Sequence, residues 1–588
     1  MVSRARRRKK KQRARQIAPA AVALALIILI ILIIGISFLV KKYSSSKELV
    51  DYEEYFSIAE EDDVVILLGN EVLETKAKLI DGEVYIDTDL LYEGVNARFY
   101  WDSQENVLLY ALPTELVTVP AGSKEYTVGK NKQSESYAPV RLDGDTAYVA
   151  LDFIQDYTAM TYEYAEEPVQ RVHINVEFGT VQTVEAKKDT QVRDKAGIKR
   201  PILTEVTKGE KLYVLEEPEE IKDWTRVRTE NGFVGYIQDK RISAVKEETL
   251  VCDYAEPVYE NISKDYKINM VWHQVTSKAG NDNIYKLLAS TKGVNTVSPT
   301  WIRLKDNDGG IESLAEQDYV DYCHQNGIEV WALVEDITYL DTIIDYEIFS
   351  RTSSRQRLVS NLIAQAIQYD LDGLNLDMEY INTQTGQAYL QFIRELSIMC
   401  RLNGITLSVD NYVPTEYSAH YDRAEQAVFA DYIIIMGYDE TPKGSTTAGS
   451  VASIDFVRNG IVNTLKEVPA EKVINAIPFY TRVWKLIPST SSDAVDGYTA
   501  VCEAEVGMSS AERYGKVNAA ETNWSQVHGQ YFVEYENGGN LYQIWLEEER
   551  SVEEKMKLIK EYDLAGVSAW KLGLEKSSVW DVILKYVN

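Results

Sequence analysis

"LDGLNLDMEY", residues 371–380, places three acidic side chains in a stretch whose Leu and Met residues are typical of a buried strand. Buried strands rarely hold unpaired carboxylates, because removing a charge from water is costly. Side chains alternate across a strand, so Asn375, Asp377 and Glu379 are predicted to point the same way. Asp372 has the opposite parity and belongs to a "DG" turn, where a structural role as an acceptor of backbone hydrogen bonds is expected.

The region around this stretch, residues 250–588, alternates between candidate strands and helical segments. Eight candidate strands in this span predict an α/β fold of the (β/α)8 TIM barrel type. Residues 486–545 are too long for a loop and predict a small α+β insertion. The predicted strands are INMVWHQV (268–275), TVSPTWIRL (296–304), IEVWALVED (328–336), LDGLNLDMEY (371–380), ITLSVDNYV (405–413), DYIIIMGYDE (431–440), VINAIPFYTRVW (473–484) and GVSAWKLG (566–573).

In a barrel strand, the shared direction of Asp377 and Glu379 is inward, toward the C-terminal mouth where barrel active sites form. Neighbouring positions on one face of a strand are roughly 6.6 Å apart. Cleavage of a glycosidic bond needs an acid that protonates the leaving oxygen and a second group that stabilises the positive charge on the sugar. Two carboxyl groups at unequal depth have different environments and therefore different pKa values and roles.

Four motifs in order resemble glycoside hydrolase family 18, the chitinases and their relatives. "DGLNLDME" is similar to the DGxDxDxE signature, with Asn375 in place of the middle acid. "MGYD" (436–439), "IPFYTRVW" (477–484) and "GVSAWKLG" (566–573) are similar to later family motifs. The branch that this chain resembles contains spore-cortex fragment-lytic enzymes and bacterial N-acetylglucosaminidases, where the middle position is commonly Asn.

The resemblance implies substrate-assisted retaining catalysis. Glu379 would be general acid and then general base, Asp377 would hold the 2-acetamido N–H, and Tyr438 would donate to the acetamido oxygen. Trp570 would form the floor under the sugar. Further substrate contacts are expected from Asn375, Met436, Asp439, Tyr480 and Arg482. Trp301, Trp331 and Trp484 are either further sugar contacts or ordinary barrel packing.

The N-terminus predicts a membrane anchor. Residues 1–16 form a basic tail, and residues 17–40 are uncharged and long enough to span a bilayer. Nine basic residues precede the span and two follow it, so the N-terminus is predicted to be cytoplasmic and the rest extracytoplasmic. The apolar run exceeds that of a cleavable signal peptide, so we predict an uncleaved single-pass anchor, followed by a linker over residues 41–63.

Two modules are predicted between the linker and the barrel. In residues 64–178, Tyr85-x-x-x-Asp89 recurs as Tyr148-x-x-x-Asp152, which indicates two similar α+β units. This segment resembles the N-terminal domain of copper amine oxidases and is interpreted as a stalk. Residues 180–246 resemble a bacterial SH3-like β-barrel through Trp224, Val227, Gly232, Gly235 and Tyr236. We interpret this module as either a wall-peptide binder or a spacer.

The composition excludes several other classes. Residues 1–42 hold eleven Lys or Arg and no acid, so the remainder has 51 basic against 91 acidic residues, which disfavours nucleic acid as a partner. No metal or nucleotide motif occurs, so neither a metal nor a cofactor is expected. The expected partner is a polysaccharide, peptidoglycan or a chitin-like GlcNAc polymer. The alternatives are a chitinase and a non-catalytic carbohydrate-binding protein on the same barrel.

Overall fold

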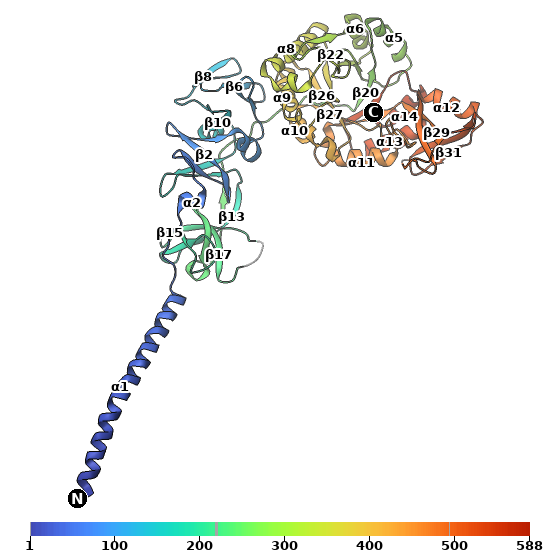
Figure 1. The fold of residues 1–588 in the computed structure, drawn as a ribbon. Coiled ribbons are helices and arrows are strands. Elements are labelled where there is room, and N and C mark those ends of the chain that lie inside the picture. Colours follow the sequence, from blue (N-terminus) through green and yellow to red (C-terminus); the bar gives the residue numbers. More distant parts are fainter. Residues whose placement is uncertain (1, 218–220, 493, 588) are drawn as a thin grey trace. The chain divides into compact units, whose positions relative to one another are not determined.

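The computed structural model describes residues 2–217, 221–492 and 494–587 (Figure 1). The chain forms two compact units. One contains residues 2–96 and 141–256, and the other contains residues 97–140 and 257–587. The second unit therefore combines the predicted barrel with a segment from much earlier in the chain.

The larger unit contains the predicted closed barrel. Its eight strands pair in parallel, and the ring closes through the pairs β20–β34 and β21–β24. Each predicted strand is present, so the TIM-barrel prediction is confirmed. In ring order the strands are β20 (Ile268–His273), β21 (Thr296–Pro299), β24 (Glu329–Glu335), β25 (Gly373–Asp377), β26 (Thr406–Tyr412), β27 (Tyr432–Met436), β28 (Val473–Pro478) and β34 (Gly566–Trp570).

Helices cover the outside of this ring (Figure 1), and their apolar faces join the outward-facing strand residues in one continuous core. Inside the ring, Trp331 packs with Trp272 and Leu333, which fills the barrel as in other eight-stranded barrels. The short strands β22 (Ile302–Leu304) and β23 (Ile311–Ser313) extend the sheet beside β24. The helices are α5 (Asn283–Leu288), α6 (Gln317–Gln325), α7 (Asp345–Ser350), α8 (Thr352–Tyr369), α9 (Gly386–Asn403), α10 (Arg423–Phe429), α11 (Ile454–Thr464), α13 (Glu549–Glu561) and α14 (Ser578–Val587).

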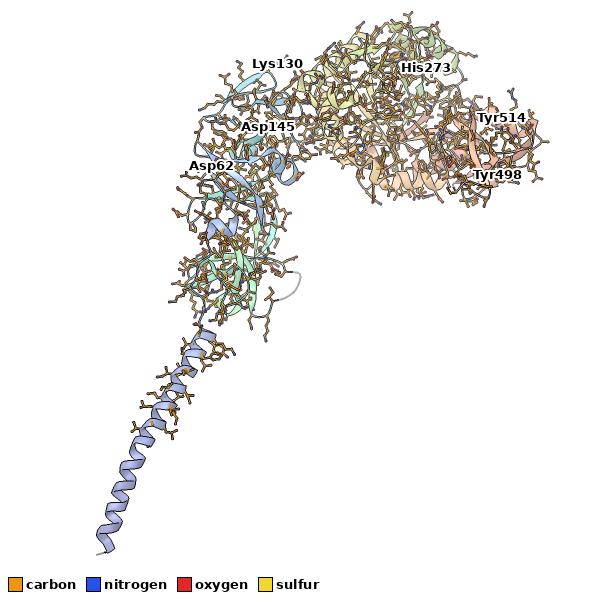
Figure 2. All side chains as sticks on the ribbon, viewed as in Figure 1. Asp62, Lys130, Asp145, His273, Tyr498 and Tyr514 are labelled. Atoms are coloured by element: carbon orange, nitrogen blue, oxygen red, sulfur yellow. The ribbon has the colours of Figure 1, made fainter. Side chains whose placement is uncertain are left out.

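An antiparallel sheet with one helix is inserted between β28 and β34. Its strand order is β30-β29-β33-β32-β31. The first inserted strand starts at Tyr480, so the segment 480–484, expected in a barrel strand, belongs to the insertion. The chain leaves the barrel after Pro478, where the Phe479 N–H donates to the Trp570 carbonyl (2.7 Å). The elements are β29 (Tyr480–Pro488), β30 (Tyr498–Gly507), α12 (Met508–Val517), β31 (Thr522–Ser525), β32 (Gln530–Asn537) and β33 (Asn540–Leu546); Tyr498 and Tyr514 mark this part in Figure 2.

The early segment of this unit, residues 97–140, is a five-stranded sheet that docks on the barrel helices. Tyr100 donates its hydroxyl to the Ser350 carbonyl (3.2 Å) and lies against the guanidinium of Arg355 (4.7 Å). Asp102 accepts from the backbone N–H and the hydroxyl of Thr352, both at 2.6 Å. The start of α8 is therefore capped by this distant sheet. Its strands are β4 (Phe99–Asp102), β5 (Val107–Ala111), β6 (Leu116–Pro120), β7 (Glu125–Val128) and β8 (Asn131–Ser134).

Replacing Asp102 with Ala is expected to lower the unfolding free energy of the barrel unit by about 2–3 kcal/mol. Asp102 is 1% exposed, and its loss leaves the first N–H of α8 buried without an acceptor. The change in unfolding free energy is measured from the unfolding transition of the barrel unit in differential scanning calorimetry. Glu105→Ala is the matched control, since Glu105 caps Ser353 of the same helix from an exposed position (3.1 Å) and should cost about 0.5 kcal/mol or less. Equal losses in both variants would contradict this account.

The smaller unit contains two seven-stranded sheets and the N-terminal helix α1 (Val2–Tyr43). The two motifs of the predicted repeat occupy similar places, because in each a strand is followed directly by a short helix. Strand β3 leads into α3 (Thr88–Leu90), and strand β10 leads into α4 (Leu151–Gln155). The first sheet has the order β11-β12-β1-β2-β3-β10-β9. Its strands are β1 (Asp63–Leu68), β2 (Glu71–Ile80), β3 (Glu83–Asp87), β9 (Val140–Asp143), β10 (Thr146–Ala150), β11 (Thr161–Ala165) and β12 (Arg171–Asn175).

The second sheet spans residues 179–250 with the order β15-β14-β18-β17-β16-β13-β19. Gly232 has φ +84° in the turn between β17 and β18, and a Cβ at Gly235 would lie 2.4 Å from the Arg193 carbonyl oxygen. Both positions therefore require glycine. The strands are β13 (Gly179–Glu185), β14 (Thr190–Arg193), β15 (Ile202–Val206), β16 (Lys211–Val214), β17 (Trp224–Thr229), β18 (Val234–Gln238) and β19 (Lys246–Leu250).

A cluster of three acids, Glu60, Asp62 and Asp63, lies in the smaller unit (Asp62 is marked in Figure 2). The ammonium of Lys78 lies within 3.3 Å of all three carboxylates. The cluster therefore already has its counter-ion.

Candidate active site

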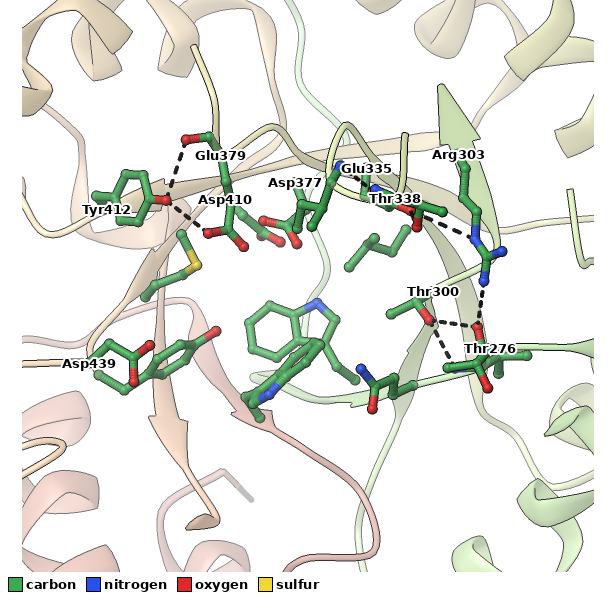
Figure 3. A pocket seen from close by; sticks show the side chains of 18 of the residues that line it. Thr276, Thr300, Arg303, Glu335, Thr338, Asp377, Glu379, Asp410, Tyr412 and Asp439 are labelled. Carbon is green, nitrogen blue, oxygen red and sulfur yellow. Dashed lines mark hydrogen bonds and ion pairs between the residues drawn. The ribbon is translucent and has the colours of Figure 1, made fainter. Parts of the chain in front are cut away.

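A cavity of about 310 Å³ opens at the carboxyl ends of the barrel strands (Figure 3). Asp377 ends β25 and Glu379 follows two residues later in the connecting loop, and both line the cavity. The end of β26 contributes Asp410 and Tyr412. In Figure 3 Asp377, Asp410 and Glu379 lie close together, and Asp439 lies across the cavity from them.

Glu379 is held in place by hydrogen bonds to its side chain and its backbone. The Tyr412 hydroxyl donates to Glu379 Oε2 (2.8 Å), and Asp336 Oδ1 accepts from the Glu379 N–H (3.1 Å). Burial raises the pKa of the Glu379 carboxyl, the Tyr412 hydrogen bond opposes the rise, and the charge of Asp439 adds to it. A carboxyl group with a raised pKa remains protonated nearer neutral pH, as a general acid requires.

Asp377 and Asp410 form a buried carboxyl pair. Asp377 is 8% exposed, and its Oδ1 is buried with no hydrogen-bond partner among the residues that the structure describes. Burial, then the neighbouring Asp410, raises the pKa of Asp377 well above its ordinary value, and burial raises that of Asp410 as well. Two buried carboxylates this close do not ionise together at neutral pH, so the pair holds a proton.

Asn375 lies below this pair and does not line the cavity. Its side chain is completely buried, and its Oδ1 accepts from Trp272 Nε1 (2.9 Å) and from the Ser298 hydroxyl (3.0 Å). Its Nδ2 donates to Asp410 Oδ1 (2.8 Å) and to the Ser408 hydroxyl (3.1 Å). All four of its hydrogen bonds are therefore made within the barrel, and contact between Asn375 and the substrate stays a prediction.

The predicted residues Met436, Tyr438, Asp439, Tyr480 and Trp570 all line the cavity. The Tyr438 hydroxyl makes no hydrogen bond to any residue that the structure describes, and is free to donate to a ligand. Arg482 does not line the cavity. It donates to Asp439 Oδ1 (2.7 Å) and to Glu505 Oε1 (3.0 Å), so it holds the wall residue Asp439 in position, and its contact with the substrate stays a prediction.

The remaining candidates from the sequence have structural contacts. Asp372 Oδ2 accepts from the Val330 N–H (2.8 Å) and lies 2.8 Å from His324 Nε2, which ties two barrel strands together. Trp301, Trp331 and Trp484 are fully buried, and each donates its indole N–H within the protein. Packing is therefore the role of these three tryptophans.

Sequence reasoning missed Asp410, Tyr412 and Asp336. The first two have a detectable signal, because Ser408, Asp410 and Tyr412 alternate along β26 with the same inward parity as Asp377 along β25. Asp336 directly follows β24 and accepts from the backbone N–H groups of Glu379 and Tyr380 (3.1 and 3.0 Å). These bonds link two separate loops and leave no local pattern in the sequence.

Asp336→Asn is expected to reduce kcat by roughly tenfold or more, because an amide can accept only one of the two loop N–H bonds. Burial, then the charge of Asp345, raises the pKa of Asp336 to about 7. The folded pKa exceeds the unfolded value of about 3.9, so this group costs stability progressively as the pH rises from about 4 to 7. The variant should therefore lose less melting temperature between pH 5 and pH 8 than the wild type.

Asp345→Asn is the control for Asp336→Asn. Burial raises the pKa of Asp345 to about 6, so this variant should also flatten the pH dependence of the melting temperature. Within the part of the chain that the structure describes, its carboxyl makes no hydrogen bond to the Glu379 loop, so kcat should stay within about twofold of the wild type. If Asp345→Asn lowered kcat as far as Asp336→Asn, a specific role of Asp336 in positioning Glu379 would be wrong.

A closed parallel barrel with carboxyl groups at its mouth defines the class as a TIM-barrel protein with an enzyme-type site. Residues 338–575 match the model of glycosyl hydrolases family 18, and residues 66–173 match that of the copper amine oxidase N-terminal domain. The barrel is a glycosyl hydrolase family 18 domain.

The relatives include the "Uncharacterized glycosylase YvbX" of Bacillus subtilis (strain 168), 28% identical over 294 residues, which are 48% of this chain and 81% of the relative. The "Cortical fragment-lytic enzyme" of the same organism is 29% identical over 245 residues, or 40% of this chain and 54% of the relative. This chain thus spans about half the length of that enzyme. The crystal structure of the Bacillus cereus spore cortex-lytic enzyme SleL is 19% identical, with a TM-score of 0.48, and the match covers 58% of this chain and 77% of that chain.

Proposed function

We propose that the barrel hydrolyses β-1,4 bonds of a GlcNAc-containing polymer, with peptidoglycan as the substrate. One observation carries the proposal. The unpartnered Asp377 Oδ1, the Glu379 carboxyl and the free Tyr438 hydroxyl all face a single cavity. An N-acetyl sugar offers a partner to each of them, namely an acetamido N–H, a leaving oxygen and an acetamido carbonyl.

In the proposed reaction, Glu379 gives its proton to the glycosidic oxygen as the bond to the anomeric carbon breaks. The acetamido oxygen of the same sugar attacks that carbon and forms a cyclic oxazolinium. Asp377 accepts the acetamido N–H and stabilises the positive charge, and Tyr438 directs the acetamido oxygen. Glu379 then removes a proton from water, which attacks the anomeric carbon and reopens the ring with net retention.

The site electrostatics suit this sequence of steps. A protonated Glu379 is favoured by burial and by the acids around it, while the Tyr412 hydrogen bond stabilises the carboxylate that remains after proton transfer. The hydrogen bond that Asn375 Nδ2 donates to Asp410 favours the negative charge of the pair on Asp410. A sugar whose acetamido N–H donates to Asp377 would favour the charge on Asp377 instead, where the oxazolinium forms. Trp570 supplies an apolar face in the cavity wall, against which a sugar ring can pack.

The N-terminus supports a location at the cell surface. Residues 21–43 form one helix that is long and apolar enough to cross a membrane, by length and composition. The basic residues before it favour a cytoplasmic N-terminus and an extracytoplasmic barrel. We propose an uncleaved signal anchor over residues 17–40, with the stalk-like module and the SH3-like module between the anchor and the barrel. A glycan at the outer face of the membrane is then the accessible substrate, which favours peptidoglycan.

The test uses the full chain in detergent micelles, incubated with purified peptidoglycan and, separately, with a chitohexaose. Borohydride reduction and mass spectrometry of the products identify the sugar at each new reducing end. The proposal expects new GlcNAc ends from peptidoglycan. Cleavage of chitohexaose alone would instead make the protein a chitinase, and intact substrates in both arms would favour a non-catalytic binding protein.

A further inference from the structure

The smaller unit contains a second cavity, of about 420 Å³, with a buried guanidinium in its wall. Strands β11 and β12 of the first sheet line one part of it, and β16, β17 and the end of β19 line another. All of its lining residues fall within 161–251 and belong to this unit. The cavity volume is in the range of small-ligand sites.

Arg228, on β17, is the buried charge of this cavity. It is 5% exposed, its Nε donates to Asn70 Oδ1 (3.1 Å), and its guanidinium carbon lies 4.0 Å from the centre of the Tyr213 ring. No carboxylate lies within 4 Å of it in the part of the chain that the structure describes. A buried cation without an anionic partner is costly, and its burial lowers the pKa of Arg228.

Two acids, Glu163 and Glu230, also line the cavity, and their charges partly oppose the lowering of the Arg228 pKa by burial, but neither carboxylate lies within 4 Å of the guanidinium. His173 Nε2 lies 2.9 Å from the Gly69 carbonyl and must donate to it, so its Nδ1 is the acceptor that faces Arg228 Nη1 (3.4 Å). Burial, then the charge of Arg228, lowers the pKa of His173 to about 4, so the ring is neutral. Glu230 also lines the cavity, but its carboxylate pairs with the Lys211 ammonium (3.5 Å).

The cavity also lies where two sheets end. β11 is the outermost strand of the first sheet and β19 is the outermost strand of the second, and both contribute residues to the lining. Edge strands present unpaired backbone N–H and C=O groups, which an extended peptide can pair with. Tyr162 and Phe178 add aromatic surface to the wall.

We propose that this cavity binds the C-terminal carboxylate of a short extended peptide. The carboxylate would pair with the guanidinium of Arg228, which can donate two parallel N–H bonds to a carboxylate. The backbone of the peptide would run along the exposed edge of β11 or β19. This site lies outside the barrel, and the proposal does not depend on glycan hydrolysis.

The test measures binding to the full chain in detergent micelles by isothermal titration. The probes are N-acetyl-alanyl-alanine and the same peptide with a C-terminal amide, which differ only in the charge that Arg228 would recognise. The wild type is expected to bind the carboxylate form at least tenfold more tightly than the amide. Equal binding of both peptides, binding of neither, or equally tight binding of inorganic phosphate would overturn the proposal.

Two variants assign the binding to Arg228. Arg228→Gln should lose at least tenfold in affinity for the carboxylate peptide. Its melting temperature should be equal to or higher than that of the wild type, because the substitution removes an unpaired buried charge. Arg226→Gln is the matched control on the same strand, since Arg226 lies 3.5 Å from Glu217 and lines a different cavity.

A merely structural Arg228 would give the opposite pattern, with a lower melting temperature and unchanged peptide binding. If Arg228→Gln fails to fold, the comparison of carboxylate and amide peptides on the wild type still decides the proposal.

Discussion

Glu379→Gln is expected to reduce glycan hydrolysis by about 10³-fold or more, while binding of the glycan is retained. Glutamine has nearly the shape of glutamic acid, and its Oε1 can still accept the hydrogen bond that Tyr412 donates to Glu379 (2.8 Å). Its amide, however, cannot protonate a leaving oxygen, and general acid catalysis contributes typically 10²–10⁴-fold. The second step is lost too, because an amide cannot remove a proton from water.

The measurement is the initial rate of product release from peptidoglycan, together with the affinity for an uncleaved glycan fragment. Tyr412→Phe is the control, because it removes the hydrogen bond to Glu379 and keeps the acid. That bond lowers the pKa of Glu379, so its removal should raise the pKa and shift the alkaline limit of activity to higher pH. A Glu379→Gln protein with more than a tenth of the wild-type rate would exclude Glu379 as the general acid.

The barrel and its two central acids were predictable because both depend on local patterns. Each of the eight strands is a short apolar run between turn signals, and the period of two in a strand places Asp377 and Glu379 on one face. The order of the motifs along the chain then fixes which strand ends meet at the mouth. No long-range contact has to be known for these steps.

The carboxyl pair depends on the register between two strands, which a single sequence does not contain. Leu376 of β25 pairs with Val409 of β26, so the next residues along the two strands, Asp377 and Asp410, lie at the same level. Asn375 then donates a hydrogen bond to Asp410 on the neighbouring strand. A shift of the register by one residue would separate the two acids.

The docking of residues 97–140 on the barrel could not be predicted from the sequence either, because it depends on long-range contacts. Asp102 and Thr352 are 250 positions apart, and the predicted boundary of the stalk-like module at residues 64–178 includes the whole segment. The related repeat motifs near Tyr85 and Tyr148 suggested two equivalent units. The structure gives the two halves different partners, since β4 and β5 pair in a separate sheet while β11 and β12 join the first one.

Asp377→Asn is expected to lower kcat by about 10²–10³-fold with a smaller change in KM. The Asn Oδ1 can still accept an acetamido N–H, so the substrate should bind, but a neutral amide cannot stabilise the positive oxazolinium. After burial, the charge of Asp410 contributes most to the raised pKa of Asp377, so replacing Asp377 removes one member of this coupled pair. The pH profile of kcat should therefore lose the ionisation that belongs to the Asp377–Asp410 pair.

Asp410→Asn separates the two members of the pair. It leaves Asp377 in the cavity and removes the neighbouring carboxyl group that raises the pKa of Asp377, so Asp377 should ionise at lower pH and the acid limb of the profile should move down. Because Asp377 can still stabilise the oxazolinium, the loss in kcat should be no more than about tenfold. If Asp410→Asn were the more damaging variant, the charge that stabilises the intermediate would reside on Asp410, and Asp377 would be its proton-holding partner.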